Sequence, residues 1–138
     1  MDLIEMLILH EGLKKKPYRD TVGKLTIGVG RNLDDIGITV DESMVLLAND
    51  IREKRGELSY YLDFFEQLDQ VRQEVLIDMC FMGIGNLLEF KKMLAALEVR
   101  DFEKAAEEML ESKWASQVKG RSIMLAGMMV TGKYPLNP

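Results

Sequence analysis

The sequence predicts an α+β protein that is predominantly α-helical, with one small antiparallel β-hairpin sheet near its N-terminus. After the turn residue Gly23, residues with larger side chains alternate with glycine and threonine from Leu25 to Gly30, which is typical of a hairpin. Apolar residues at helical spacing precede this run and follow it almost to the end of the chain. At 138 residues the chain is one folding unit by size, long enough to bury a core.

The N-terminal elements each have a start or turn signal. Asp2 with Glu5 three residues later forms a capping box, which predicts a helix from there to about His10. The hairpin follows, with its turn at Gly23 and a third short strand expected over residues 31–33. Thr39 with Glu42 is a second capping box, and it predicts a long helix over about residues 39–58.

The rest of the chain is expected to be helical. Asp69 and Asp101 are expected to cap the N-termini of two helices. The helix after Asp69 is expected to be the most buried, with Cys80 on its inner face. The expected segments are a short aromatic-rich helix within 56–68, the helix after Asp69 ending near 82–86, a helix over 87–97, a helix over 102–111 with Phe102, Ala105, Ala106, Met109 and Leu110 inward, a segment opening at Trp114, and a final helix over 122–130.

Composition indicates an ordinary globular protein made in a reducing compartment. Hydrophobic residues make up 47% and charged residues 30% of the chain, and the single cysteine, Cys80, excludes an internal disulfide. One histidine and one cysteine argue against a zinc site. The N-terminus has no basic signal-peptide region, and no stretch approaches membrane-spanning length, so neither a secretory signal nor stable membrane insertion is expected.

Charge is distributed unevenly. The net charge is −5, yet between His10 and Asn32 six lysines and arginines face two acids. A positive hairpin would steer an anionic polymer toward it at low salt, although a solvated basic turn beside an acidic helical body explains the pattern equally well. No nucleic-acid partner is indicated.

Two carboxylates stand out in the first 30 residues. Glu11 follows a run of apolar residues at helical spacing and precedes Gly12, which places it at the C-terminal end of a helix, where the helix dipole disfavours its charge. Asp20 lies in the hairpin, and Thr26 on its second strand offers a hydroxyl that can hold water. Two acids across a groove are what glycoside hydrolysis needs. Solvated acids in a loop region are the alternative.

The spacing of these residues resembles the phage-type lysozymes, glycoside hydrolase family 24, typified by the lysozyme of the T-even phages. The string E-G-x5-Y-x-D-x2-G-x2-T-x-G-x-G is formed by Glu11, Gly12, Tyr18, Asp20, Gly23, Thr26, Gly28 and Gly30. The resemblance also reaches the far end, where the family's W-x2-Q-x3-R and T-G spacings are matched by Trp114, Gln117 and Arg121 and by Thr131 and Gly132.

The resemblance implies a lysozyme-like, two-lobed fold within a single domain, 1–138. Its hairpin lobe would cover about residues 12–38, the linking helix about 39–58 and the helical lobe about 59–138, with the helix 1–11 packed on that lobe.

It also implies an endo-acting muramidase that needs no cofactor. The expected reaction is hydrolysis of the β-1,4 bond between N-acetylmuramic acid and N-acetylglucosamine in peptidoglycan glycan strands, with inversion, which requires carboxyl groups roughly 6.5–9.5 Å apart. Glu11 would be the general acid, Asp20 would activate the water and Thr26 would hold it. Arg121 would reach the catalytic glutamate, and the saccharide cleft would be lined by Gly30, Asn32 and Phe81.

Three positions depart from the family's pattern. Arg31 replaces a histidine, the segment after Phe81 lacks an amide residue, and the last helix is apolar where relatives carry basic residues. The acidic net charge, the shortened segment and the apolar last helix favour a second class of function, a catalytically weak or inactive lysozyme-fold domain that binds peptidoglycan or protein. Residues 122–130 would then form a homodimer or bind a protein partner, unless Ile123, Leu125 and Met129 simply fill the core. Transglycosylase chemistry fits Asp20 and Thr26 poorly, because it needs no positioned water.

The family also implies where such a protein works. It would be made in a bacterial host cytoplasm without a signal peptide, reach the wall through a holin, and lyse bacterial cells.

Overall fold

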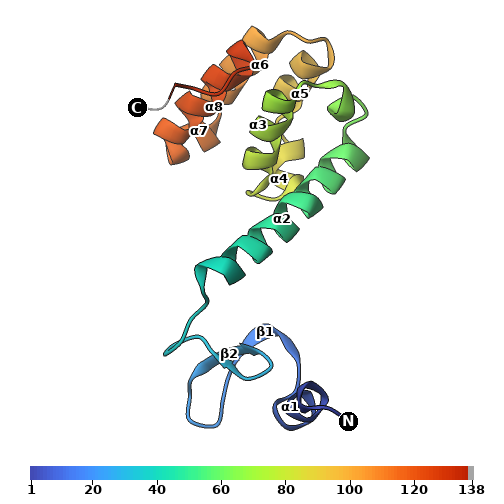
Figure 1. The fold of residues 1–138 in the computed structure, drawn as a ribbon. Helices are drawn as coiled ribbons and strands as arrows, with labels where there is room; N and C mark the ends of the chain where they lie inside the picture. The colour runs from blue at the N-terminus through green and yellow to red at the C-terminus, as the bar shows by residue number, and fades with distance from the viewer. Residues whose placement is uncertain (137–138) are drawn as a thin grey trace. The chain divides into compact units, whose positions relative to one another are not determined.

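The computed structural model describes residues 1–136, and it confirms a predominantly helical α+β fold with a small three-stranded antiparallel sheet in that part of the chain (Figure 1). The chain divides into two compact units, unit 1 (Met1–Ala48) and unit 2 (Asn49–Pro138). Among the residues described, no helix is both long enough and apolar enough to cross a membrane.

Unit 1 begins with α1 (Leu3–Glu11), which the predicted capping box opens. The Asp2 carboxylate accepts from the Glu5 N–H at 2.8 Å, and the Glu5 carboxylate accepts from the Asp2 N–H at 3.1 Å. Gly12 ends the helix at φ 77°, and its N–H donates to the Ile8 carbonyl at 2.8 Å. None of the nine residues of α1, all of them described, is buried. Packing of this helix on the helical lobe stays a prediction.

The sheet has the order β1-β2-β3, with β1 at Lys14–Arg19, β2 at Leu25–Gly28 and β3 at Arg31–Asn32. Both pairings are antiparallel, so the predicted hairpin and third strand are confirmed. Gly23 forms the turn with φ 85°, a conformation that other residues rarely adopt. Thr26 lies in the middle strand, opposite Tyr18 on one side and Asn32 on the other.

The helix α2 (Val40–Tyr61) begins in unit 1 and ends in unit 2. The second capping box is present, with the Thr39 N–H 2.9 Å from the Glu42 carboxylate and the Glu42 N–H 3.1 Å from the Thr39 hydroxyl. The helix runs past Gly56 to Tyr61, so the short helix expected within 56–68 is confirmed only in part, as a single 3₁₀ turn. Leu58 is fully buried and anchors the last turns of α2, and only a 3₁₀ turn, η1 (Phe65–Gln67), follows.

The core of unit 2 is built around α3 (Gln70–Cys80), capped by Asp69 as predicted. Val75, Leu76, Met79 and Cys80 are all 0% exposed, which confirms that this helix is deeply buried. Burial also raises the pKa of the Cys80 thiol, as expected for a residue packed as a small hydrophobe.

Two short helices, α4 (Ile84–Leu88) and α5 (Lys91–Glu98), replace the single helix expected over residues 87–97. The first starts early because Gly83 takes φ 102° and redirects the chain. The break falls at Glu89 and Phe90, where the Phe90 ring packs edge-on against Trp114 at a centroid distance of 6.1 Å.

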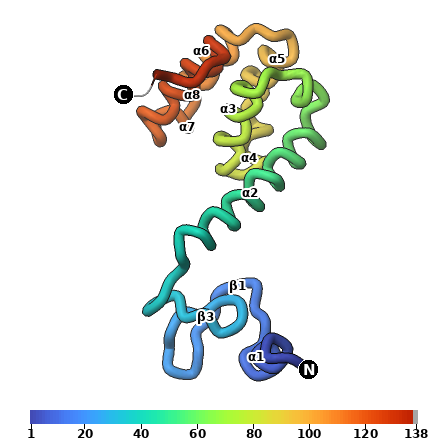
Figure 2. Tube along the Cα trace, in the orientation of Figure 1, coloured from blue at the N-terminus to red at the C-terminus, as the bar shows by residue number. Residues whose placement is uncertain are grey.

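Three helices complete unit 2, namely α6 (Phe102–Leu110), α7 (Lys113–Val118) and α8 (Gly120–Thr131), and α8 packs beside α6 (Figure 2). Asp101 caps α6 as predicted, accepting from the Lys104 N–H at 3.1 Å. Leu110 was expected inward but is 48% exposed, because α6 ends there and the chain turns toward α7.

The burial of α8 differs from the simplest expectation. Leu125 and Met129 fill the core as predicted, but Ile123 is 67% exposed while Met128 is only 5% exposed. The C-terminal end of α8 is held by Arg72 of α3, which donates to the Met129 carbonyl at 2.7 Å and to the Val130 carbonyl at 2.9 Å. A cation at this helix end is favourable because carbonyls there lack helical partners.

Candidate active site

Glu11 is the last residue of α1, and its side chain lies against Gly30 of the hairpin. A Cβ atom built on Gly30 would stand 3.0 Å from Glu11 Oε2 and 3.1 Å from Glu11 Cδ, which is too close for an unadjusted contact. Gly30 also takes φ 66°, which favours glycine. The absence of a side chain at Gly30 therefore leaves the space that the Glu11 carboxylate occupies.

Asp20 holds the hairpin turn together with one of its carboxylate oxygens. Oδ1 accepts from the Val22 N–H at 2.9 Å and from the Lys24 N–H at 2.8 Å. The backbone closes the same turn, because the Asp20 N–H donates to the Lys24 carbonyl at 2.9 Å. Asp20 is half-buried, and this turn fixes the direction of its carboxylate.

Thr26 is one of the two buried polar residues among residues 1–136, at 3% exposed. Its hydroxyl donates to the Lys24 carbonyl at 2.8 Å, so Asp20 and Thr26 share the Lys24 backbone as a hydrogen-bond partner. The hydroxyl hydrogen is thereby used inside the hairpin, which leaves the oxygen as an acceptor.

Asn32 and Arg31 stabilise the loop after the sheet. The Asn32 amide donates to the Asp35 carboxylate at 3.0 Å and accepts from the Asp35 N–H at 2.9 Å. Arg31, which departs from the family's histidine, pairs with both oxygens of Glu42 at 2.8 and 2.7 Å. The hydrogen bond from Arg31 lowers the pKa of Glu42 to about 2.

Phe81 and Arg121 belong to unit 2. Phe81 follows directly on α3 and is 45% exposed. The Arg121 guanidinium pairs with Asp78, Nε to Oδ1 at 2.9 Å and Nη2 to the Asp78 carbonyl at 3.0 Å. Its expected approach to the catalytic glutamate stays a prediction.

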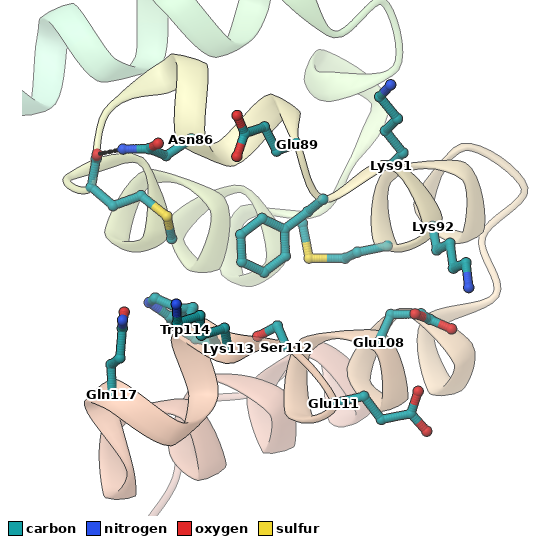
Figure 3. Close-up of a pocket in the computed structure, with 13 residues that line it drawn as sticks. Asn86, Glu89, Lys91, Lys92, Glu108, Glu111, Ser112, Lys113, Trp114 and Gln117 are labelled. Carbon is teal, nitrogen blue, oxygen red and sulfur yellow. Dashed lines mark hydrogen bonds between the residues drawn. The ribbon is translucent and has the colours of Figure 1, made fainter.

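A pocket of about 790 Å³ lies within unit 2, between α4 and α5 on one side and α6 and α7 on the other (Figure 3). Phe90 and Trp114 give it an aromatic edge, and lysines and glutamates surround it. Its lining residues are Met82, Asn86, Glu89, Phe90, Lys91, Lys92, Met93, Glu108, Glu111, Ser112, Lys113, Trp114 and Gln117.

Two features of the structure are not predicted by the sequence: the pocket of unit 2 and the contact between Glu11 and Gly30 in unit 1. The W-x2-Q spacing marks Trp114 and Gln117, but nothing in it reveals that α4 and α5 form the opposite wall of a pocket. The contact between Gly30 and Glu11 is the second such feature, while the place of Gly30 in the saccharide cleft stays a prediction. The position of Gly30 in the G-x-G spacing is the only sequence signal for that contact.

Comparison with known proteins gives consistent matches. The model of the phage lysozyme family matches residues 9–130. Two relatives from Dictyostelium discoideum, probable T4-type lysozymes 1 and 2, are 32% and 31% identical, and the matches cover 93% and 94% of both chains. The pre-baseplate central spike protein of Enterobacteria phage T4 is 29% identical over 96% of this chain, which spans only 28% of that protein.

The matched range 9–130 contains all the site residues predicted from the sequence, both those in unit 1 and those in unit 2. Within unit 1, Glu11 lies at a helix end and Asp20 lies in a hairpin turn, and glycoside hydrolysis generally uses a pair of carboxyl groups. This chain therefore belongs to the phage lysozyme family and is a glycoside hydrolase.

Proposed function

We propose that the protein is an endo-acting muramidase that hydrolyses the β-1,4 bond between N-acetylmuramic acid and N-acetylglucosamine by acid catalysis with inversion. The observation that carries this proposal is the placement of the Glu11 carboxylate against Gly30, in the same compact unit as Asp20 and Thr26. Peptidoglycan as the substrate follows from the family.

The three residues would divide the work as follows. Glu11, at the negative end of the α1 dipole, donates its proton to the leaving glycosidic oxygen. Asp20 uses Oδ1 to hold the hairpin turn, and we assign its second oxygen, Oδ2, to the attacking water. Thr26, whose hydroxyl hydrogen is donated to Lys24, accepts a hydrogen bond from the same water.

We assign supporting roles to the other predicted residues. Arg121 acts as a positioning residue for Glu11, a proposal that rests on the W-x2-Q-x3-R spacing. In the structure the Arg121 guanidinium is held by hydrogen bonds to Asp78. Asn32 and Phe81 line the saccharide cleft. Gly30 contributes to that cleft by its missing side chain, which also accommodates Glu11.

Analysis of the sugar at the new reducing end tests which bond is cleaved. Isolated peptidoglycan is digested, the new ends are reduced with borohydride, and the reduced sugars are separated after acid hydrolysis. A muramidase yields reduced muramic acid. Reduced glucosamine would identify a different bond, and 1,6-anhydromuramic acid would identify a transglycosylase. Proton NMR of a fresh digest is expected to show the α-anomer first, since inversion of a β bond produces it.

We further propose that the unit 2 pocket contacts the peptide part of the wall polymer. Its lysines and glutamates match the carboxylates and amines of short peptides better than they match neutral sugars. Trp114 is the single tryptophan and lies 8% exposed at this pocket, so its fluorescence reports binding. A soluble peptide-bearing muropeptide is expected to change the emission saturably, whereas a chitin oligosaccharide is not. Equal responses would contradict the peptide assignment.

In the cell, we propose that the protein lyses bacteria and thereby acts as an antibacterial agent. It would be made in a host cytoplasm and reach the wall through a holin. Lysis of permeabilised cells but not of intact cells, when the protein is added from outside, is the expected result. The second candidate, a lysozyme-fold binding domain, is favoured by the exposed Ile123 and Met124 of α8. Peptidoglycan binding without any new reducing ends would support it.

A further inference from the structure

The outer side of α8 is apolar and has no charged residue. Ile123 is 67% exposed, Met124 is 55% exposed and Val130 is 43% exposed. Ile123 and Met124 lie four and three residues before Gly127, and Val130 lies three residues after it, so helical spacing puts all three on one side of the helix, around Gly127. No described atom lies within 4 Å of a Cβ built on Gly127 beyond the helix itself, so this side of α8 is open.

Two exposed cations flank this apolar surface along the chain. Residues 112–138 contain four cations, Lys113, Lys119, Arg121 and Lys133, and no aspartate or glutamate, although the whole chain has a net charge of −5. Lys119 directly precedes α8 and Lys133 closely follows it, and both are exposed. The helix therefore presents apolar side chains between two cationic ends.

Two carboxylates of the neighbouring helix α3 approach α8, and both have partners. Asp78 is paired with Arg121 through two hydrogen bonds to the guanidinium. Glu74 accepts a hydrogen bond from the Tyr134 hydroxyl, which raises the pKa of Tyr134 to about 12. The Arg121 pair offsets the charge of Asp78 and so reduces the repulsion that α3 would exert on an anionic surface, whereas Glu74 keeps its negative charge.

We propose that the outer face of α8, formed by Ile123, Met124 and Val130 between Lys119 and Lys133, binds the surface of an anionic phospholipid bilayer. An apolar helix face with flanking cations is the pattern of a helix that lies in the membrane interface, where apolar side chains enter the headgroup boundary and cations meet anionic lipids. This is surface binding without a spanning segment, and it is independent of glycoside hydrolysis.

The same observations disfavour a second copy of the chain as the occupant. Two copies meeting through α8 would bring the cationic ends together without a carboxylate from either α8 face to neutralise them. Three partly exposed side chains also fall well short of the roughly 800 Å² per partner that a specific protein interface buries. An anionic bilayer would attract the cationic ends, and it does not require the large buried area of a specific protein interface.

Vesicle co-sedimentation tests the proposal with the full chain. Wild type is expected to bind vesicles of phosphatidylcholine containing phosphatidylglycerol, to bind pure phosphatidylcholine vesicles at least about tenfold less, and to lose binding as salt increases. Ile123→Ser and the double variant Lys119→Glu/Lys133→Glu are each expected to weaken binding about tenfold. Circular dichroism spectra matching wild type would show that the variants fold.

Matched control variants make the same kinds of substitution, apolar to serine and lysine to glutamate, elsewhere in unit 2. Val99 is 74% exposed, so Val99→Ser removes a comparable apolar side chain, and Lys91→Glu/Lys92→Glu makes the same charge change. Both controls are expected to bind like wild type. The proposal is overturned if wild type ignores anionic vesicles, or if the control variants lose as much binding as the α8 variants. A dimer of wild type that Ile123→Ser dissociates, without vesicle binding, would assign the face to a second copy.

Discussion

At the scale of single residues, the contact between Glu11 and Gly30 links the two ends of the signature. The sequence spacing puts the acid and the glycine 19 positions apart, and the fold places the Glu11 carboxylate where a Gly30 side chain would be. Glycine at position 30 thus permits both the left-handed backbone conformation and the observed position of the Glu11 carboxylate.

Replacing Gly30 with alanine should therefore reduce activity more than it reduces stability. A left-handed alanine costs about 1–2 kcal/mol, and the new methyl group would also push the Glu11 carboxylate aside, a displacement that can cost on the order of 10²-fold in rate. Initial rates of reducing-end formation and thermal unfolding measure the two effects.

Gly28→Ala is the matched control for that prediction. Gly28 takes φ 68°, close to the 66° of Gly30, but no described atom lies within 4 Å of the Cβ position. Both variants should lose similar stability, and only Gly30→Ala should lose most of its activity. Equal rates for the two variants would show that the contact with Glu11 has no catalytic role.

At the scale of elements, the Arg31–Glu42 pair joins β3 to the start of α2. Arg31 also donates to the Gly37 carbonyl at 3.0 Å, so one side chain connects the strand, the loop and the helix. Glu42 additionally belongs to the capping box with Thr39. Arg31 therefore has a structural role within unit 1.

Glu42→Gln should make the protein less stable at neutral pH and less sensitive to acid. The folded-state pKa of Glu42, about 2, lies below its ordinary value near 4.5, so its contribution to stability is full above the ordinary value and disappears as pH falls toward 2. The difference in melting temperature between wild type and Glu42→Gln is expected to shrink from pH 5 to about pH 2. A difference that stays constant across this range would contradict the role of the charge.

Local signals in the sequence were sufficient to predict most elements. The capping boxes at Asp2 and Thr39 and the caps at Asp69 and Asp101 mark helix starts because a side-chain oxygen there satisfies a free backbone N–H. The alternation around Gly23 likewise predicts the hairpin. These patterns act within four or five residues, so the sequence displays them directly.

The features that the sequence did not predict depend on contacts between distant segments. The division into α4 and α5 occurs where Phe90 meets Trp114, and the continuation of α2 past Gly56 depends on the burial of Leu58. Apolar residues occur on all sides of α8, so the periodicity of the sequence does not indicate which side faces the core. The exposure of Ile123 could therefore not be predicted. The Glu11–Gly30 contact is of the same long-range kind.

At the scale of the whole molecule, charge is segregated along the chain. The hairpin region and the C-terminal 27 residues are basic, whereas the chain as a whole carries a net charge of −5. A basic hairpin would attract an anionic wall polymer to the unit that holds Glu11 and Asp20, and salt would weaken that attraction. Activity on isolated peptidoglycan should accordingly be higher at low salt than at moderate salt.

The most direct test of catalysis by Glu11 is the rate at which new reducing ends form in isolated peptidoglycan, measured for wild type, Glu11→Gln and the exposed-site control Glu53→Gln. Loss of a positioned general acid should lower the rate by about 10²–10⁴-fold, with unchanged circular dichroism and melting temperature, while Glu53→Gln retains the wild-type rate. A folded Glu11→Gln variant that cleaves peptidoglycan as fast as wild type would contradict the assignment of Glu11 as the acid.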